Sequence, residues 1–174
     1  MHTLHCIATT AASKGDAYNK VRDAIDAEDG IAPWSDWSEV GGGRWANSDD
    51  PLDGVLSYDD TPIEFIAEIK RIHSNRCSEL KNNLERSNWR VAIEDQTERF
   101  TREIIFPEPF LIERSPIDME LYYLDRAVGL LNGRYHNSSY FYDLDDWTSD
   151  LYPLLGRLNN GEKNQFLVRV DFHH

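Results

Sequence analysis

The densest group of side chains suited to binding lies in residues 34–45, where tryptophans flank a run of glycines followed by an arginine. Backbone amides of glycine can approach an anion closely, and an arginine can form paired hydrogen bonds with a phosphate or carboxylate. A tryptophan face can stack on a base. This pattern makes five residues candidates for binding a ligand or partner: Trp37, Gly42, Gly43, Arg44 and Trp45.

The same segment also has a structural interpretation, in which the glycines form a bulge or tight turn and the tryptophans pack into the core. A glycine-rich turn without the Lys-Ser/Thr pair of a phosphate-binding loop favours this interpretation. We therefore expect Trp45 to be structural. Arg44 remains a candidate anchor for a partner protein or for a small nucleotide.

Four carboxylates crowd one turn region and raise the question of a cation site: Asp143, Asp145, Asp146 and Asp150. Hard cations take such oxygens, but the spacing matches no EF-hand loop and the required glycine is missing. Capping and solvation of a helix start explain these residues more simply. We predict no metal here.

Histidines and cysteines supply a second set of possible metal ligands: His5, Cys6, His73, Cys77, His136, His173 and His174. His73 and Cys77 are four residues apart, which is one helical turn and a spacing that zinc sites use. Both fall on the apolar stripe of a predicted long helix, which favours a buried cysteine and an accommodated histidine. We predict neither a metal nor another cofactor.

Catalytic patterns are absent from the sequence. No Ser-His-Asp or Cys-His order accompanies a recognised nucleophile turn, and Ser138-Ser139 lacks the G-x-S-x-G context. The sequence therefore predicts a protein that is not an enzyme.

The elements that position these residues begin with one long helix. Thr61 is predicted to cap it, Pro62 to occupy its first position and Glu64 to close a capping box. Apolar or neutral residues at intervals of three and four predict a buried stripe along roughly 25 residues: Ile66, Ile69, His73, Cys77, Leu80 and Leu84.

Shorter elements surround this helix. Strands are predicted at 4–9, 37–40, 55–57, 140–144 and 165–172. Further helices are predicted from Asp16, which is placed to cap the first of them, to Gly30, from Ser115 to Gly133 and over 149–158. In the last strand, Phe166, Val168, Val170 and Phe172 face one way, and Arg169 and Asp171 the other. Residues 87–106 fit either a helix or a strand.

These elements predict one α+β domain over residues 1–174, with a small mixed sheet covered by several helices. The strand–helix–strand start and the helix–strand finish resemble ferredoxin-like elements with an inserted helical segment. The length fits one domain with a substantial core.

Charge and composition limit the possible partners. The chain has 31 acidic and 18 basic residues, for a formal net charge of −13. That field disfavours direct binding to nucleic acid and suits a basic protein, although it also serves solubility alone. Two cysteines, no signal peptide and no apolar stretch of roughly 20 residues predict reduced thiols, no membrane association and a cytoplasmic location.

Two motifs carry a resemblance. The segment Trp37-x-x-x-Gly-Gly-Gly-Arg44-Trp45, with the closing Val168-Arg-Val-Asp171-Phe-His173, resembles small uncharacterised proteins of phages and their hosts. Those proteins pair a Trp-x-x-x-Gly-Gly-Arg-Trp turn with a final strand ending in hydrophobic-Asp-x-His. Here the turn has one extra glycine and His174 follows the motif. The resemblance implies a viral or mobile-element setting, and it implies no activity or catalytic residue.

The leading hypothesis is a non-enzymatic phage-type accessory protein in the host cytoplasm. It would bind and inhibit a host factor, such as a CRISPR or other defence component, through an acidic surface that meets a basic host or phage protein. One alternative is a small-molecule binder whose glycine-arginine-tryptophan turn holds a nucleotide. Another is a virion or assembly protein.

Overall fold

The computed structural model describes residues 1–27, 29–46, 48–87 and 116–174, with side chains from residue 122 onward in the last range. Five strands and four helices follow one another in the described residues. They are β1 (His2–Thr10), α1 (Lys14–Asp26), β2 (Trp37–Val40), β3 (Val55–Ser57), α2 (Pro62–Arg86), α4 (Pro116–Leu131), β4 (Phe141–Asp143), α5 (Tyr152–Asn159) and β5 (Gln165–His173). Two short 3-10 helices, Gly43–Trp45 and Pro51–Gly54, lie between β2 and β3.

The sheet is mixed, as predicted, and β5 is its most connected strand. The order is β2-β5-β1-β4, and β3 also pairs with β5. β5 runs antiparallel to β1, β2 and β3, whereas β4 runs parallel to β1. The two terminal strands pair along their full length, from His2 opposite His173 to Thr10 opposite Gln165.

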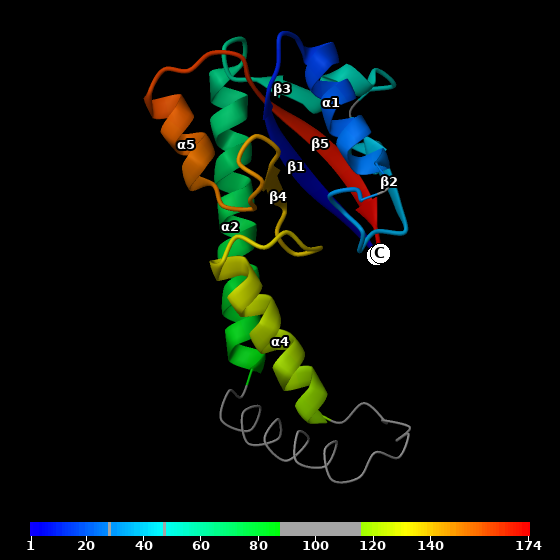
Figure 1. Cartoon of the computed structure of the whole chain (residues 1–174), viewed down its shortest axis with the longest axis vertical. Helices are drawn as coiled ribbons and strands as arrows, with labels where there is room; N and C mark the ends of the chain where they lie inside the picture. Colours follow the sequence, from blue (N-terminus) through cyan, green and yellow to red (C-terminus); the bar gives the residue numbers. More distant parts are fainter. Residues whose placement is uncertain (28, 47, 88–115) are drawn as a thin grey trace.

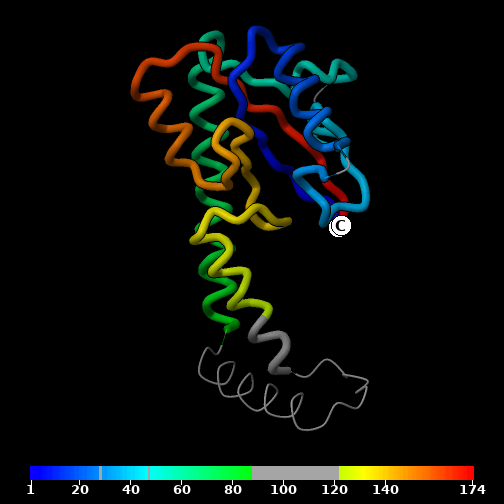
Figure 2. Tube along the Cα trace, in the orientation of Figure 1, coloured from blue at the N-terminus to red at the C-terminus, as the bar shows by residue number. Residues whose placement is uncertain are grey.

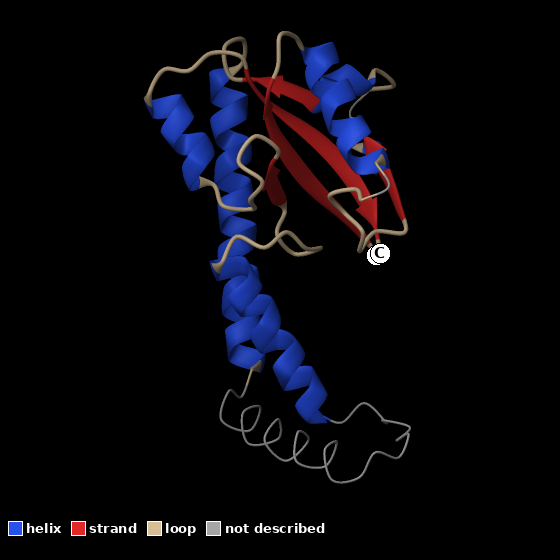
Figure 3. Cartoon of the chain, in the orientation of Figure 1, coloured by secondary structure: helices blue, strands red, loops and turns tan. Residues whose placement is uncertain are grey.

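Helices cover both faces of the sheet (Figure 1). α1 packs on one face, against a core that includes the predicted row of alternating side chains: Phe166, Val168, Val170 and Phe172. α2 and α5 pack on the other face, where Cys6, Phe65 and Leu154 are buried together. Figure 3 shows this arrangement of strands between helices. The α+β class is confirmed, as are the strand–helix–strand start and the helix–strand finish.

The helix caps differ from the sequence predictions. Ser13, rather than Asp16, caps α1: its Oγ accepts from the backbone N of Asp16 at 3.2 Å and donates to the Asp16 carboxylate at 2.8 Å. Thr61 does not cap α2 with its side chain, because its Oγ1 donates to the carbonyl of Ser57 at 3.1 Å. Pro62 occupies the first helical position, as predicted.

The long helix α2 has the predicted length of 25 residues but buries a different stripe. The buried side chains are Phe65, Glu68, Ile69, Ile72 and Asn83. Of the predicted stripe, Ile69 is buried, Ile66 and Leu80 are half-buried, and His73, Cys77 and Leu84 are exposed. Both stripes share a helical period and differ by about one residue of rotation. The predicted stripe was rotated because Glu68 and Asn83 are polar and were therefore not assigned to the buried face of the helix, which meets the sheet and α4.

α2 continues past the sheet, where its second half packs beside α4 (Figure 2). α4 starts at Pro116 and ends at Leu131. Gly133, which has a φ of +70°, ends the turn that follows α4 and so stops the helix where the sequence predicted. The ambiguous segment 87–106 lies outside the described residues except for Ser87. Within the described residues, no helix combines the length and apolar character that crossing a membrane requires.

The rotated stripe on α2 can be tested by paired truncations. Phe65 is fully buried and Leu84 is 48% exposed. We expect Phe65→Ala to lower the free energy of unfolding by about 3–5 kcal/mol through a core cavity, and Leu84→Ala to change it by less than about 0.5 kcal/mol. Urea unfolding followed by circular dichroism measures both. A larger loss for Leu84→Ala than for Phe65→Ala would contradict the observed orientation of the helix.

Candidate functional site

The predicted glycine turn lies where the chain leaves the sheet edge between β2 and β3. Gly41, Gly42 and Gly43 all have positive φ, of +101°, +100° and +47°, a region that favours glycine. A Cβ on Gly43 would lie 2.7 Å from the Cβ of Asp171, and one on Gly41 would lie 2.8 Å from the carbonyl oxygen of Pro51. These glycines are therefore required by the backbone path, which brings the following 3-10 helix against β5.

Asp171 is the buried centre of this site, with 1% of its surface exposed. One carboxylate oxygen lies 3.0 Å from Nδ1 of His2, and the other accepts from the backbone N of Arg44 at 3.3 Å. A carboxylate that accepts from a ring nitrogen fixes both the tautomer and the orientation of the imidazole. Asp171 thus ties β1 and the glycine turn to β5.

Four aromatic rings gather above Asp171 on the same end of the sheet. The His2 ring lies 6.0 Å from Trp37, 6.3 Å from Trp45 and 5.0 Å from His173, in each case edge-to-face. Trp37 is 48% exposed and Trp45 is 37% exposed. We call these four residues, His2, Trp37, Trp45 and His173, the tryptophan platform. The guanidinium of Arg44 extends it, 5.7 Å from the Trp45 ring.

The structure brings all five candidate residues together. Trp37 and Trp45 belong to the platform, Arg44 borders it, and Gly42 and Gly43 shape the turn beneath it. The expectation of a core position for Trp45 was wrong. The positive φ values of the glycine turn direct the chain across the edge of the sheet, where Trp45 remains 37% exposed. Trp34 is the exception within the segment: it packs on the opposite face, against His5 and Phe172.

Sequence reasoning missed His2 as a site residue. Its contact with Asp171 joins residues 169 positions apart. The alternation of the last strand places Asp171 and His173 on one face, but only the register with β1 sets His2 beside them. The sequence did contain a hint of this contact. When the first and last strands of a chain pair antiparallel, the start of one lies beside the end of the other, as His2 lies beside His173.

A buried ion cluster lies next to the platform on the same face of the sheet. Glu68 of α2 accepts from Arg71 at 2.7 Å and from the thiol of Cys6 at 3.1 Å, and its other oxygen lies 3.4 Å from Arg169. Burial alone would raise the pKa of Glu68, but hydrogen bonds from Arg71 and Cys6 and the two guanidinium charges lower that pKa to about 2. Burial and the Glu68 carboxylate raise the pKa of the Cys6 thiol well above its usual range. Cys6 is therefore a poor nucleophile.

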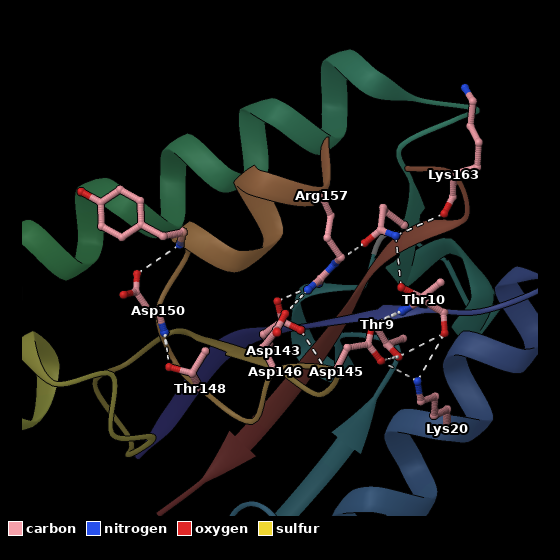
Figure 4. Close-up of polar contacts among 12 residues, drawn as sticks. Thr9, Thr10, Lys20, Asp143, Asp145, Asp146, Thr148, Asp150, Arg157 and Lys163 are labelled. Atoms are coloured by element: carbon pink, nitrogen blue, oxygen red, sulfur yellow. Dashed lines mark hydrogen bonds and ion pairs between the residues drawn. The ribbon is translucent and has the colours of Figure 1, made fainter. Parts of the chain in front are cut away.

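The acidic turn after β4 is a structural network, as Figure 4 shows. Asp143 is fully buried and accepts from Arg157 at 2.7 Å. Asp145 accepts from the backbone N of Thr10 at 2.6 Å and from Lys20 at 2.7 Å. The capping prediction applies to Asp150, whose carboxylate accepts from the backbone N of Tyr152 at 3.1 Å at the start of α5. Asp145 and Asp146 are exposed, as solvation predicts, although each also binds a cation. Asp143 is the exception, because it is buried.

The possible soft-metal pair lies on the surface. The Cys77 thiol and Nε2 of His73 are 3.6 Å apart, and both residues are exposed rather than buried as predicted. Among the described residues, no group of three histidine, cysteine or acidic side chains is placed to hold a metal ion.

The glycine requirement gives a prediction with an internal control. Gly43→Ala meets both a positive φ and the close Cβ of Asp171, so we expect it to destabilise the chain by about 1–3 kcal/mol and to shift the His2 and Trp45 resonances. Gly156 in α5 has open space around it, so Gly156→Ala should stabilise by up to about 1 kcal/mol. Thermal unfolding and proton–nitrogen NMR spectra measure both. Equal effects of the two substitutions would refute the proposed constraint.

The Glu68 cluster predicts a pH dependence. Because the folded-state pKa of about 2 lies below the ordinary value of 4.5, the stabilisation is present above pH 4.5 and is lost as the pH falls toward 2. We expect Glu68→Gln to be less stable than the parent at pH 7 by up to about 3 kcal/mol, with the gap narrowing as the pH falls. Urea unfolding at several pH values measures this. Glu162→Gln, at an exposed position after α5, is the control and should show no such gap.

Comparison with protein-family models, with curated proteins and with solved structures finds no match to this chain. No relative therefore assigns a role to any residue of the site.

Proposed function

We propose that this chain is a non-catalytic binding protein that docks a basic partner protein on the tryptophan platform. The observation that carries the proposal is the pair of half-exposed tryptophans, Trp37 and Trp45, packed around His2 and anchored through buried Asp171. Tryptophan and arginine dominate the energetic centres of protein interfaces, and rigid aromatic groups lose little entropy on binding. Arg44, next to the Trp45 ring, is a further residue of a type enriched at interface centres.

The charge around the platform supports a basic partner. Five exposed carboxylates lie on the chain segments that carry the platform and its turn: Asp36, Glu39, Asp49, Asp50 and Asp53. An aromatic centre with an acidic rim suits a surface of lysines and arginines, since complementary rim charges raise the rate of association. The formal net charge of −13 acts in the same direction over longer distances.

The proposal includes no catalytic step at the platform. His2 and Asp171 are arranged like the base and orienting acid of a hydrolase. Among the described residues, however, His2 forms no hydrogen bond with a hydroxyl or thiol that could act as a nucleophile. We propose that the contact between Asp171 and His2 holds the His2 ring in place beneath the tryptophans of the platform.

A phage or mobile-element setting is part of the proposal. The two motifs that carry the resemblance to phage proteins contribute Trp37, Trp45, Asp171 and His173 to one site. In that setting we propose that the partner is a host factor, such as a CRISPR or other defence component, and that docking inhibits it. A virion or assembly partner is the alternative that the same binding experiment would identify.

The geometry favours a protein partner over a nucleotide at this turn. The backbone N of Arg44 donates to the Asp171 carboxylate, and that of Trp45 donates to the carbonyl of Gly42. The backbone N of Gly41 donates to the carbonyl of Arg169. A phosphate placed here would find these amides engaged and a carboxylate beneath them, which opposes its binding.

Tryptophan substitutions test the docking surface. We expect Trp37→Ala and Trp45→Ala each to weaken partner binding by at least about 2 kcal/mol, roughly 30-fold in Kd, because both rings would leave the centre of the interface. Partners are captured from host lysate with the tagged chain, identified by mass spectrometry, purified and titrated by calorimetry. Affinity should also fall as salt rises, since exposed charges are screened beyond roughly 8 Å at physiological ionic strength.

The matched control is Trp147→Ala. Trp147 is 73% exposed and lies in the turn after β4. It lies two residues after Asp145, which binds Thr10 at the opposite end of β1 from His2. Its loss should leave the captured partner unchanged. A partner that binds all three variants equally, or whose affinity is independent of salt, would refute the platform as the docking site.

A further inference from the structure

A second candidate site is a cleft of about 950 Å³ between the helical pair and the end of the sheet. It is lined by the second half of α2, by α4, by the loop before β4 and by the residues at the tips of β1 and β5. Its volume is within the range of small-molecule sites, roughly 300–1,000 Å³. We call it the hairpin cleft. It shares none of its lining with the tryptophan platform.

Buried donors without acceptors line this cleft. Asn83 of α2 is 3% exposed, and its Nδ2 has no hydrogen-bond partner within the described part of the chain. Nε of Arg126 in α4 is likewise buried and without a partner there. Buried polar groups in folded proteins are rarely left unpaired, and each exception calls for a water, an ion or a ligand. Nδ2 of Asn83 and Nε of Arg126 are both donors, so the missing groups are acceptors.

Positive charge collects at the same place. Arg86 of α2 lies 5.2 Å from the Tyr123 ring centre, and Arg126 lies 5.2 Å from that of Tyr122. Neither arginine forms an ion pair among the described residues. The one acidic residue of the described lining, Glu79, accepts from the hydroxyl of Tyr140 at 3.2 Å. In a chain of net charge −13, two such arginines make the cleft locally attractive to an anion.

We propose that the hairpin cleft binds a small organic phosphate that carries an aromatic ring. Two guanidinium groups from facing helices match the double charge and several oxygens of a phosphate better than they match a single carboxylate. The amide of Asn83 would donate to a further oxygen or to a ring nitrogen. Tyr122 and Tyr123 offer rings on which the aromatic part would stack. The volume accommodates a molecule of mononucleotide size.

The test uses AMP as the probe, with inorganic phosphate and adenosine as separate arms, each titrated into the full chain by calorimetry. We expect AMP to bind at least about tenfold more tightly than either fragment, because the fragments each keep only part of the contacts. Binding of AMP should weaken with salt. No detectable AMP binding at millimolar concentration, or binding no tighter than that of either fragment, would overturn the proposal.

Variants on α2 separate a ligand site from a structural or water-filled cavity. Asn83→Leu should weaken AMP binding by at least about tenfold while leaving the melting temperature equal or higher, since it removes an unpaired buried amide and keeps a similar volume. Arg86→Gln should also weaken binding by at least about tenfold. Lys81→Gln removes the same charge from the same helix outside the cleft lining and should leave binding unchanged.

Two results from these variants would count against the site. Unchanged AMP binding in both Asn83→Leu and Arg86→Gln would mean that a water, not a ligand, satisfies the amide. An equal loss in Lys81→Gln and Arg86→Gln would mean that net charge alone attracts the probe. Capture of a partner by the platform is measured without AMP, so failure here leaves the docking experiment unaffected.

Discussion

The antiparallel pairing of β1 with β5 is the constraint on which the rest of the structure depends. Nine residues at one end of the chain pair with nine at the other, and every other strand of the described residues pairs with β1 or β5. Closing so long a loop costs chain entropy, which burial on both faces of the pair offsets. α1 supplies the cover on one face, and α2 with α5 supply it on the other.

The same pairing builds the platform and stabilises the buried charges around it. It sets His2 beside Asp171, and the glycine turn then brings Arg44 and Trp45 over that carboxylate. Among the described residues, the buried carboxylates bind cations or donors: Glu68 binds arginines and a thiol, and Asp143 binds an arginine. Because removal of one partner from such a group leaves an uncompensated charge, these contacts fix the orientation of α2 and α5 on the sheet.

Local patterns in the sequence determined much of the fold. Alternating apolar residues predicted β5 and the face that it turns toward α1. Pro62 and Gly133 marked the start of α2 and the end of the turn after α4, and the glycine run marked the end of β2. These predictions were correct because each depends only on local backbone geometry or on the burial of residues that are close in sequence. The five candidate residues of the turn were singled out by composition in the same way, and the structure places them together at one end of the sheet.

Tertiary structure decided the features that depend on distant contacts. The sequence placed Trp45 in the core and His73 with Cys77 on the buried stripe of α2, but the packed chain exposes all three. It could not show that Glu68 belongs to the buried face, because a carboxylate is buried only when cations such as Arg71 and Arg169 reach it from elsewhere. It could not join His2 to Asp171, since the strand register that brings them together is set by the burial of both faces along the whole strand.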